Sequence, residues 1–357
     1  MQKTQDVRIK NFKHLPSPTV ISSEHPITEE IIDSINAYRK TIENILNGKD
    51  QRLIAIVGPC SIHDEKAALD YAVRLKELSD KLSDKFFIVM RTYFEKPRTN
   101  LGWKGLILDP DLNETYDIEK GIRLARKILI QICELGLPVG CEVLDPIIPQ
   151  YIDELMSWSS IGARTTESQI HRNLASGLSV PVGFKNSTSG DVSVAVNAVK
   201  SASSPSSFIG INREGETGIL STTGNKACHI ILRGSDTGPN YYEDDIENVK
   251  KQMDKLELNN AIIVDCSHSN SRKDYKKQKR VLRNIIEQII WGETAIKGFM
   301  LESNIYEGNQ KISKLEEMKY GVSITDSCIS FAETEAILTS SYRLLEKGLD
   351  EWKQLFY

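Results

Sequence analysis

The chain has 357 residues, of which 40% are apolar and 26% are charged, and its formal net charge is −4. This composition is ordinary for a globular protein, and the negative charge excludes the overall basic field that nucleic-acid-binding proteins present. No run of about 18 apolar residues is present and the first residues do not resemble a signal peptide, so no membrane span or secretion is expected. The six cysteines (60, 133, 141, 228, 266 and 328) lack CxxC spacing, which favours reduced thiols in a cytoplasmic protein.

The first 50 residues are predicted to form an arm and a helix that serve assembly or regulation. Residues 1–24 are polar and contain prolines, which favours an extended arm. A helix is expected over 28–47, where Thr28 can cap the first turn and Gly48 can end the last. The remainder, 51–357, is predicted to be a single catalytic domain.

In that domain short β-rich runs alternate with amphipathic helical segments. The predicted strands cover 53–57, 86–94, 139–144, 161–165, 182–185, 230–232, 261–265 and 295–302. The predicted helices that follow them cover 65–82, 118–135, 150–157, 167–176, 192–201, 243–256, 275–291 and 333–347. Eight strand–helix units predict an α/β fold of the (β/α)8 barrel type.

One segment does not fit this count. Residues 208–211 and 218–222 flank a turn-rich stretch and predict a β-hairpin inserted at about 206–224. A barrel does not need it, so it either serves regulation or assembly or is only a surface decoration.

Four apolar runs, each in a predicted strand, close on a cation: Arg91, Arg164, Lys185 and Arg233. The carboxyl ends of parallel strands lie on one face of a barrel, so these charges should converge. Because cations that crowd together repel each other, the pattern indicates an anionic ligand that carries phosphate or carboxylate. For any single cation the alternative is a surface salt bridge. Behind the second strand, Lys96, Pro97, Arg98 and Thr99 form a stiffened loop that predicts a second phosphate site.

A thiol, an imidazole and two carboxylates follow strands that become neighbours when the barrel closes: Cys60, His268, Glu302 and, in a later loop, Asp326. Sulfur, nitrogen and oxygen ligands together suit one borderline divalent ion such as Mn²⁺, Fe²⁺, Co²⁺ or Zn²⁺. The alternative is a buried thiol, a hydrogen-bonded histidine and ion-paired acids. His63 is a rival ligand on spacing alone, and Cys266 is interpreted as a small core residue.

Nine motifs, in order and in one register from about residue 6 to 350, resemble the microbial type I 3-deoxy-D-arabino-heptulosonate 7-phosphate (DAHP) synthases. They are GPCSIHD (58–64), YFEKPRT (93–99), GWKGL (102–106), IGARTTESQ (161–169), PVGFKN (181–186), HIILRG (229–234), DCSHSNS (265–271), ESNIYEGNQ (302–310) and YGVSITDSCI (320–329).

The resemblance implies the first reaction of the shikimate pathway to aromatic amino acids, in which phosphoenolpyruvate condenses with erythrose 4-phosphate and phosphate is released. It implies phosphoenolpyruvate contacts at Arg91, Lys96, Arg164, Lys185 and Arg233. It implies erythrose 4-phosphate contacts at Lys96, Pro97, Arg98 and Thr99, and a divalent metal on Cys60, His268, Glu302 and Asp326. The metal would polarise the sugar aldehyde. Lys96 is the candidate proton donor, with metal-bound water as the alternative, and Glu142 would position the attacking water.

The amino-acid sequences of these motifs are most similar to those of the tyrosine-sensitive branch of that family. This resemblance implies feedback inhibition by an aromatic amino acid, tyrosine rather than phenylalanine. The implied cavity is lined by Asp6, Pro149, Gln150, Leu174, Leu178, Ser179, Phe208, Gly210 and Leu220. For the apolar members the alternative is plain packing of the hairpin on the barrel. The resemblance also implies a homodimer or homotetramer, in which the arm crosses to a neighbouring subunit.

Three other functions are alternatives to this one. They are a metal-dependent aldolase acting on a phosphorylated ketone, the related 8-phosphate synthase acting on arabinose 5-phosphate, and a non-catalytic barrel that senses aromatic amino acids. The first does not account for a second anion site, and the intact set of ligands and cations argues against the third.

Overall fold

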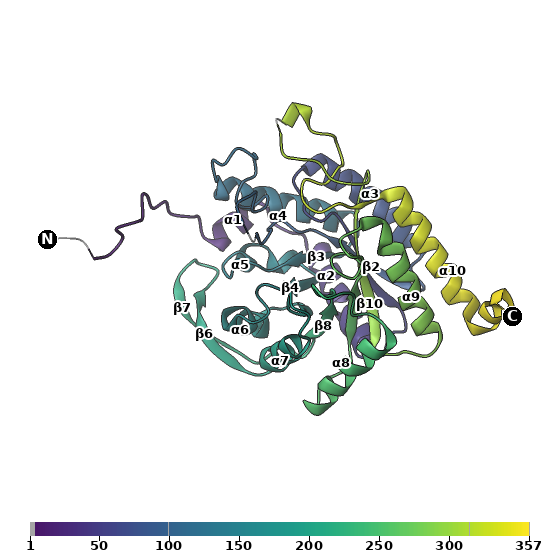
Figure 1. Cartoon of the computed structure of the whole chain (residues 1–357). Coiled ribbons are helices and arrows are strands. Elements are labelled where there is room, and N and C mark those ends of the chain that lie inside the picture. The colour runs from purple at the N-terminus through teal and green to yellow at the C-terminus, as the bar shows by residue number, and fades with distance from the viewer. Residues whose placement is uncertain (1–3, 99, 314, 357) are drawn as a thin grey trace.

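The computed structural model describes residues 4–98, 100–313 and 315–356. Eight parallel strands are hydrogen-bonded in the order β1-β2-β3-β4-β5-β8-β9-β10, and a pairing of β1 with β10 closes the barrel (Figure 1). The strands are β1 (Leu53–Gly58), β2 (Phe86–Arg91), β3 (Val139–Glu142), β4 (Trp158–Ile161), β5 (Val182–Lys185), β8 (His229–Leu232), β9 (Ile262–Asp265) and β10 (Ile296–Asn304). This confirms the predicted (β/α)8 architecture. A short β11 (Ile329–Ser330) pairs in parallel with the end of β10.

Helices surround the barrel and cover its strands. They are α1 (Pro18–Glu24), α2 (Glu29–Leu46), α3 (Glu65–Lys81), α4 (Ile118–Glu134), α5 (Pro149–Ile152), α6 (Gln169–Gly177), α7 (Ser193–Ala202), α8 (Glu243–Lys255), α9 (Gln278–Ile290) and α10 (Phe331–Phe356). Three short 3-10 helices are η1 (Asp153–Leu155), η2 (Tyr275–Lys277) and η3 (Leu315–Glu317). None of the described helices combines the length and the apolar character that crossing a bilayer requires.

The core has two layers, because successive residues of a strand point to opposite faces. In β1, Ala55 and Val57 pack outward with the helices, whereas Ile54 and Ile56 belong to a separate inner cluster. Ile42 and Ile45 of α2 join that inner cluster, and Asn259, just before β9, donates a hydrogen bond from Nδ2 to the carbonyl of Leu46 (2.8 Å). Helix α2 therefore closes the amino-terminal end of the barrel, which leaves the other end for a site.

The fourth strand was predicted at 161–165 but spans Trp158–Ile161. After Ile161 the chain turns, since the N–H groups of Thr165 and Thr166 both donate to the carbonyl of Gly162. The sequence Trp-Ser-Ser-Ile has no apolar run, although all four of its residues are buried. The strand was therefore predicted too late in the sequence, and Arg164 lies in the loop after β4 rather than on the strand.

The arm was predicted to be extended over 1–24, and this is wrong for its end, where α1 forms. The hydroxyl of Ser17 accepts a hydrogen bond from the N–H of Val20, and Pro18 occupies the first helical turn. A capping serine followed by proline is a helix-start signal that the proline content obscured. The assignment of residues 1–50 to assembly or regulation stays a prediction.

The inserted hairpin is confirmed. Strands β6 (Ser206–Ile211) and β7 (Thr217–Thr222) pair antiparallel in a separate two-stranded sheet. In Figure 1 the hairpin lies outside the barrel, beside α6 and α7.

Candidate active site

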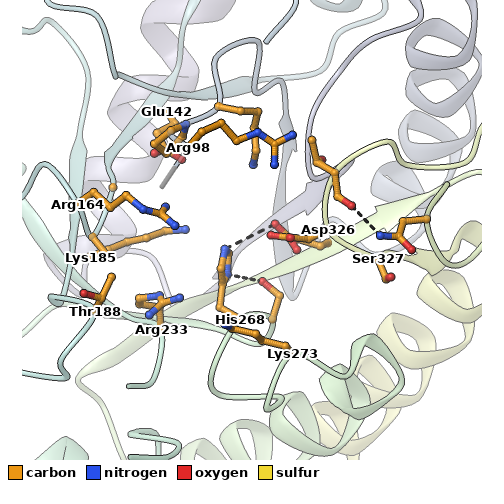
Figure 2. Close-up of a pocket in the computed structure, with 18 of the residues that line it drawn as sticks. Arg98, Glu142, Arg164, Lys185, Thr188, Arg233, His268, Lys273, Asp326 and Ser327 are labelled. Atoms are coloured by element: carbon orange, nitrogen blue, oxygen red, sulfur yellow. Dashed lines mark hydrogen bonds and ion pairs between the residues drawn. The ribbon is translucent and has the colours of Figure 1, made fainter. Parts of the chain in front are cut away.

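The carboxyl ends of the strands surround a cavity of about 570 Å³. Its wall is rich in cations, which are Lys96, Arg98, Arg164, Lys185, Arg233 and Lys273. It also contains three carboxylates and an imidazole, which belong to Glu142, Glu302, Asp326 and His268. Figure 2 shows Arg164, Lys185 and Arg233 on one side of the cavity and Asp326 on the other, with His268 between them. The predicted convergence of cations at one mouth of the barrel is therefore observed for Arg164, Lys185 and Arg233.

Arg91 does not line this cavity. Its side chain is completely buried, and its Nη2 donates to Oε1 of Glu302 at 3.1 Å. The Nε atom donates to the carbonyl of Pro59 (3.4 Å), and Nη1 has no acceptor. Arg91 thus lies beneath Glu302 and braces it, and its Nη1 is left without an acceptor.

The loop predicted as a second phosphate site borders the same cavity. Lys96, Pro97 and Arg98 line it, and Nε of Arg98 donates to the carbonyl of Trp103 (2.8 Å). Thr99 lies outside the described residues. Sequence reasoning missed Lys273 and Thr188, which also line the cavity. Lys273 follows the DCSHSNS motif by two residues, which was the only available signal.

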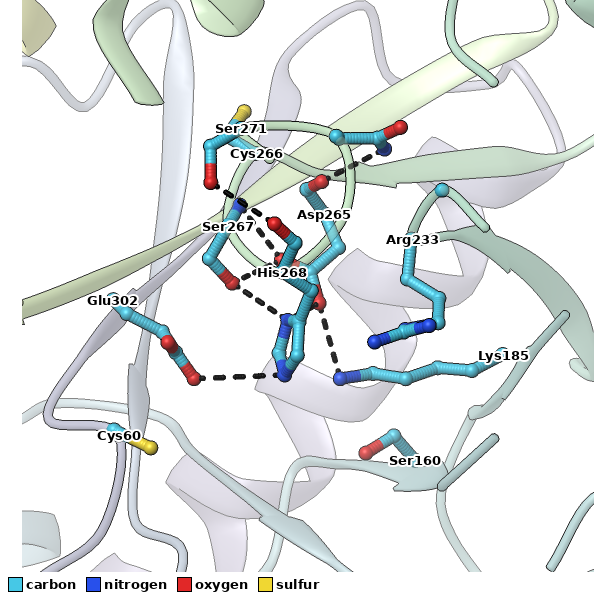
Figure 3. Close-up of polar contacts among 12 residues, drawn as sticks. Cys60, Ser160, Lys185, Arg233, Asp265, Cys266, Ser267, His268, Ser271 and Glu302 are labelled. Atoms are coloured by element: carbon cyan, nitrogen blue, oxygen red, sulfur yellow. Dashed lines mark hydrogen bonds and ion pairs between the residues drawn. The ribbon is translucent and has the colours of Figure 1, made fainter. Parts of the chain in front are cut away.

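The predicted metal ligands come together. The sulfur of Cys60 and carboxylate oxygens of Glu302 and Asp326 all lie within 4.8 Å of one another, and Nε2 of His268 is 3.9 Å from Oε1 of Glu302. Figure 3 shows the ring of His268 facing Glu302, with the sulfur of Cys60 below the carboxylate. The rival ligand His63 lines a separate small cavity beside α3, and Cys266 is buried and absent from the group.

His268 is held by its other ring nitrogen. Nδ1 is hydrogen-bonded to Oγ of Ser267 (2.7 Å), whose hydroxyl donates to Oδ1 of Asp265 (2.6 Å), and Oδ2 of this carboxylate lies 2.9 Å from Nδ1. A carboxylate on Nδ1 leaves the lone pair of Nε2 for a metal, which is the usual arrangement of a metal-bound histidine. Burial raises the pKa of Asp265, but His268 and Lys185 (Nζ 3.0 Å away) outweigh it and hold this pKa well below the usual range.

The thiol of Cys60 faces a cation. Nζ of Lys96 is 3.2 Å from the sulfur and 3.2 Å from the carbonyl oxygen of the same residue. Burial, reinforced by Glu302, raises the pKa of Cys60 to about 11. The residues present therefore fit a cation: a thiol, two carboxylates and an oriented imidazole converge, and a bound ion would replace the thiol proton.

Glu142 lies on the cavity wall because residue 162 has no side chain. A Cβ atom on Gly162 would lie only 2.3 Å from Oε1 of Glu142. Glycine at this position, at the start of the loop that carries Arg164, lets the buried carboxylate of Glu142 reach the cavity.

The residues predicted to line a regulatory cavity lie on four segments. Phe208 on β6 and Leu220 on β7 are cross-strand partners, and Cδ1 of Leu220 is 2.7 Å from where a Cβ on Gly210 would be. The other members are Pro149 and Gln150 on α5, Leu174 on α6, Leu178 and Ser179 just after α6, and Asp6 on the arm. A cavity of about 650 Å³ beside the hairpin is lined by Leu178 and Ser179 but not by the others. Figure 1 shows the arm reaching away from the barrel.

Comparison with known proteins decides the family. The model of the DAHP synthetase I family matches residues 24–339. The chain belongs to this family. It is 48% identical over 352 residues to the Tyr-sensitive phospho-2-dehydro-3-deoxyheptonate aldolase of Escherichia coli K12. The matched region covers 98% of this chain and 99% of that protein.

Two further relatives agree. The Phe-sensitive phospho-2-dehydro-3-deoxyheptonate aldolase of Escherichia coli K12 is 48% identical over 336 residues, covering 94% of this chain and 96% of that protein. The solved phospho-2-dehydro-3-deoxyheptonate aldolase from Francisella tularensis SCHU S4 superimposes with a TM-score of 0.92 at 47% identity, covering 94% of this chain and 98% of that one. The predicted family and enzyme class, a DAHP synthase of aromatic amino acid biosynthesis, are confirmed.

Proposed function

We propose that this DAHP synthase condenses phosphoenolpyruvate with erythrose 4-phosphate, with release of phosphate, and depends on one divalent metal ion. The observation that carries the proposal is the cavity itself, in which a cationic wall faces a group of sulfur, nitrogen and oxygen ligands. Both substrates are polyanions that repel each other, and cations on both sides of one cavity offset that repulsion.

Phosphoenolpyruvate is assigned to the side of Arg164, Lys185 and Arg233. Charge-assisted hydrogen bonds contribute about 1.5–3 kcal/mol each, so three or four can hold a phosphate and a carboxylate against hydration. Arg91 does not line the cavity, so its proposed contact with phosphoenolpyruvate requires the anion to reach the buried Nη1, which has no acceptor. Erythrose 4-phosphate is assigned to Lys96, Pro97, Arg98 and Thr99. Of these residues, Arg98 lies across the cavity from Arg233 (Figure 2).

Cys60, His268, Glu302 and Asp326 would hold the ion, for which mixed ligands favour Mn²⁺, Fe²⁺, Co²⁺ or Zn²⁺. When bound, it supplies Lewis-acid polarisation of the aldehyde. Asp265 fixes the ring of His268, and Arg91 fixes Glu302.

Two side chains are assigned proton-transfer roles. Burial lowers the pKa of Lys96, but Cys60 and Glu302 outweigh it and raise this pKa, so the ammonium group stays charged and can donate a proton to the growing alkoxide. Glu142 orients the water that attacks the enol carbon.

Feedback inhibition by an aromatic amino acid at the hairpin is part of the proposal, with tyrosine as the inhibitor. The motif wording supports tyrosine, whereas the two E. coli relatives match equally well at 48% identity. Assays with each amino acid separately decide: inhibition by phenylalanine alone would contradict this assignment. A homodimer or homotetramer is likewise proposed.

Phosphate release is the decisive assay. We expect release only when phosphoenolpyruvate and erythrose 4-phosphate are both present, loss of release with a chelator, and recovery with added metal. Lys185→Gln should abolish it, whereas Lys200→Gln, which removes a surface lysine bonded to Leu256, should not. Condensation without phosphate release would favour the metal-dependent aldolase. A preference for arabinose 5-phosphate would favour the 8-phosphate synthase, and no turnover at all would favour the non-catalytic sensor.

A further inference from the structure

The backbone around Arg233 and Gly234 is hydrogen-bonded on every side. The N–H of Arg233 donates to Oδ1 of Asn186 (2.9 Å), and the N–H of Gly234 donates to Oδ1 of Asn240 (2.7 Å). The carbonyl of Gly234 accepts from Nδ2 of Asn186 (3.0 Å). The carbonyl of Arg233 accepts from the N–H groups of Ser269 and Asn270 (3.2 and 3.3 Å). All four polar backbone groups of these two residues therefore have partners.

Three buried asparagines supply most of these contacts and also bind each other. Asn186, Asn240 and Asn270 are 0%, 9% and 3% exposed. Nδ2 of Asn240 donates to Oδ1 of Asn186 (3.1 Å), and the N–H of Asn240 donates to Oδ1 of Asn270 (2.9 Å). Nδ2 of Asn270 donates to the carbonyls of Leu232 (3.1 Å) and Asp265 (2.9 Å). We call this group the asparagine clamp.

The clamp joins loops that are far apart in the sequence. Asn186 follows β5 directly, Asn240 lies between β8 and α8, and Asn270 lies between β9 and α9. Gly234 lets the loops approach, because its φ is +78° and a Cβ there would lie 2.6 Å from the nitrogen of Asn270. Each amide is used as donor and acceptor, which neither a carboxylate nor an aliphatic side chain can reproduce.

The residues that the clamp connects belong to the site. Asn186 is next to Lys185, Asn270 is two residues from His268, and the clamp binds the backbone of Arg233 itself. None of the three asparagines lines the cavity, whereas Lys185, Arg233 and His268 do. The clamp therefore cannot act by touching a substrate bound in the cavity.

We propose that Asn186, Asn240 and Asn270 are positioning residues that fix Arg233, and with it the anion-binding side of the cavity, relative to the loop of His268. This inference rests on the proposed assignment of phosphoenolpyruvate to that side. A backbone held at every polar group has few alternative positions, so the guanidinium is preorganised and less entropy is lost when the anion binds.

Asn240→Ala tests the clamp, because it removes both side-chain contacts without touching the cavity wall. The affinity for phosphoenolpyruvate alone is measured by calorimetry on the Mn²⁺-supplied enzyme, together with kcat, both KM values and the melting temperature. We expect at least about a fivefold loss of phosphoenolpyruvate affinity, since two buried hydrogen bonds are lost. The KM for erythrose 4-phosphate should change by less than about twofold, because Arg98 lies on the other rim.

Asn225→Ala is the matched control. Asn225 lies between the hairpin and β8, away from the clamp. Its Nδ2 likewise donates to backbone carbonyls, which are those of Ala175 on α6 and of Leu178 and Val180 just after α6. It should lower the melting temperature without weakening phosphoenolpyruvate binding. If both variants lose affinity in proportion to their loss of stability, or if Asn240→Ala binds like the wild type, the clamp has no positioning role.

Asn240→Ser, which leaves room for a bridging water, serves if the alanine variant does not fold, and the same loss of affinity is expected. A wild-type enzyme that turns over both substrates while the Asn240 variants bind normally would overturn only the clamp. A wild-type enzyme without turnover would overturn the proposed function instead.

Discussion

The guanidinium carbon of Arg91 lies 4.0 Å from the ring centroid of Tyr93, so the buried cation is stacked on an aromatic face. Nζ of Lys96 lies 5.9 Å from the same centroid. The hydroxyl of Tyr93 is hydrogen-bonded to Oγ of Ser160 on β4 (2.8 Å), which fixes the ring. One aromatic side chain thus supports two cations of the site from below.

Tyr93→Leu should weaken phosphoenolpyruvate binding. A desolvated cation–π contact contributes about 2 kcal/mol, so we expect the KM for phosphoenolpyruvate to rise on the order of tenfold. Tyr93→Phe keeps the ring and loses only the bond to Ser160, so its KM should stay near that of the wild type. Steady-state kinetics on both variants checks this. Equal behaviour of the two would show that the ring face does not matter.

The barrel could be predicted because its strands and helices are local patterns. Apolar runs such as that of β1, and the amphipathic helices between the strands, are visible without any tertiary information. The placement of Lys185 and Arg233 followed from the rule that carboxyl ends of parallel strands share a face. Motif resemblance supplied the ligand set of Cys60, His268 and Glu302, which spacing alone left open.

Contacts between distant loops could not be predicted. The amides of Asn186, Asn240 and Asn270 have no periodic signature, and their roles depend on side-chain geometry. Arg91 appeared equivalent to Arg233 in the sequence, yet it is buried beneath Glu302 while Arg233 lines the cavity. β4 was misplaced because its polar serines are buried by tertiary contacts rather than by their own hydrophobicity.

Glu95 should make stability depend on pH. It is 3% exposed, and burial together with the nearby Asp145 carboxylate raises its pKa from 4.5 to about 8. The folded state favours the protonated form, so the stabilising contribution is complete below about pH 4.5 and is lost as the pH rises through about 8.

Glu95→Gln should therefore raise the melting temperature at pH 9 and change it little at pH 5. The rise at pH 9 corresponds to an increase in the free energy of unfolding on the order of a few kcal/mol. Thermal melts across this range check the prediction. Glu77→Gln, at an exposed position of α3, should show no such trend. A Glu95→Gln effect that is the same at both pH values would contradict the raised pKa.

Gly162→Ala should impair turnover through Glu142. The added methyl would overlap Oε1 of Glu142, whose carboxylate must move away from the cavity. We expect kcat to fall on the order of tenfold, because a catalytic group that is moved from its position loses much of its contribution to the rate. Gly218→Ala on β7, where a Cβ meets nothing within 4 Å, should leave kcat unchanged.

A double-mutant cycle identifies the route of that effect. In a Glu142→Gln background Gly162→Ala should cost little more, because neighbouring residues that act through one another are not additive. Full additivity would mean that the methyl acts through the loop of Arg164 instead of through Glu142.

Metal should stabilise the fold through Cys60. A ligand that binds only the folded state raises the melting temperature, and the stabilisation grows with the logarithm of the ratio of its concentration to its Kd. Added Mn²⁺ should therefore raise the melting temperature of the chelator-treated enzyme, and Cys60→Ser should remove most of that shift, because a serine hydroxyl is a far poorer ligand than a thiolate. Cys266→Ala is the matched control, since Cys266 is also a buried thiol just after a strand, β9, but lies outside the group formed by Cys60, Glu302 and Asp326. Its metal-induced shift should equal that of the wild type, even if its starting melting temperature is lower. A Cys60→Ser enzyme that keeps the full shift would exclude Cys60 as a ligand and leave the ion to His268 and the two carboxylates.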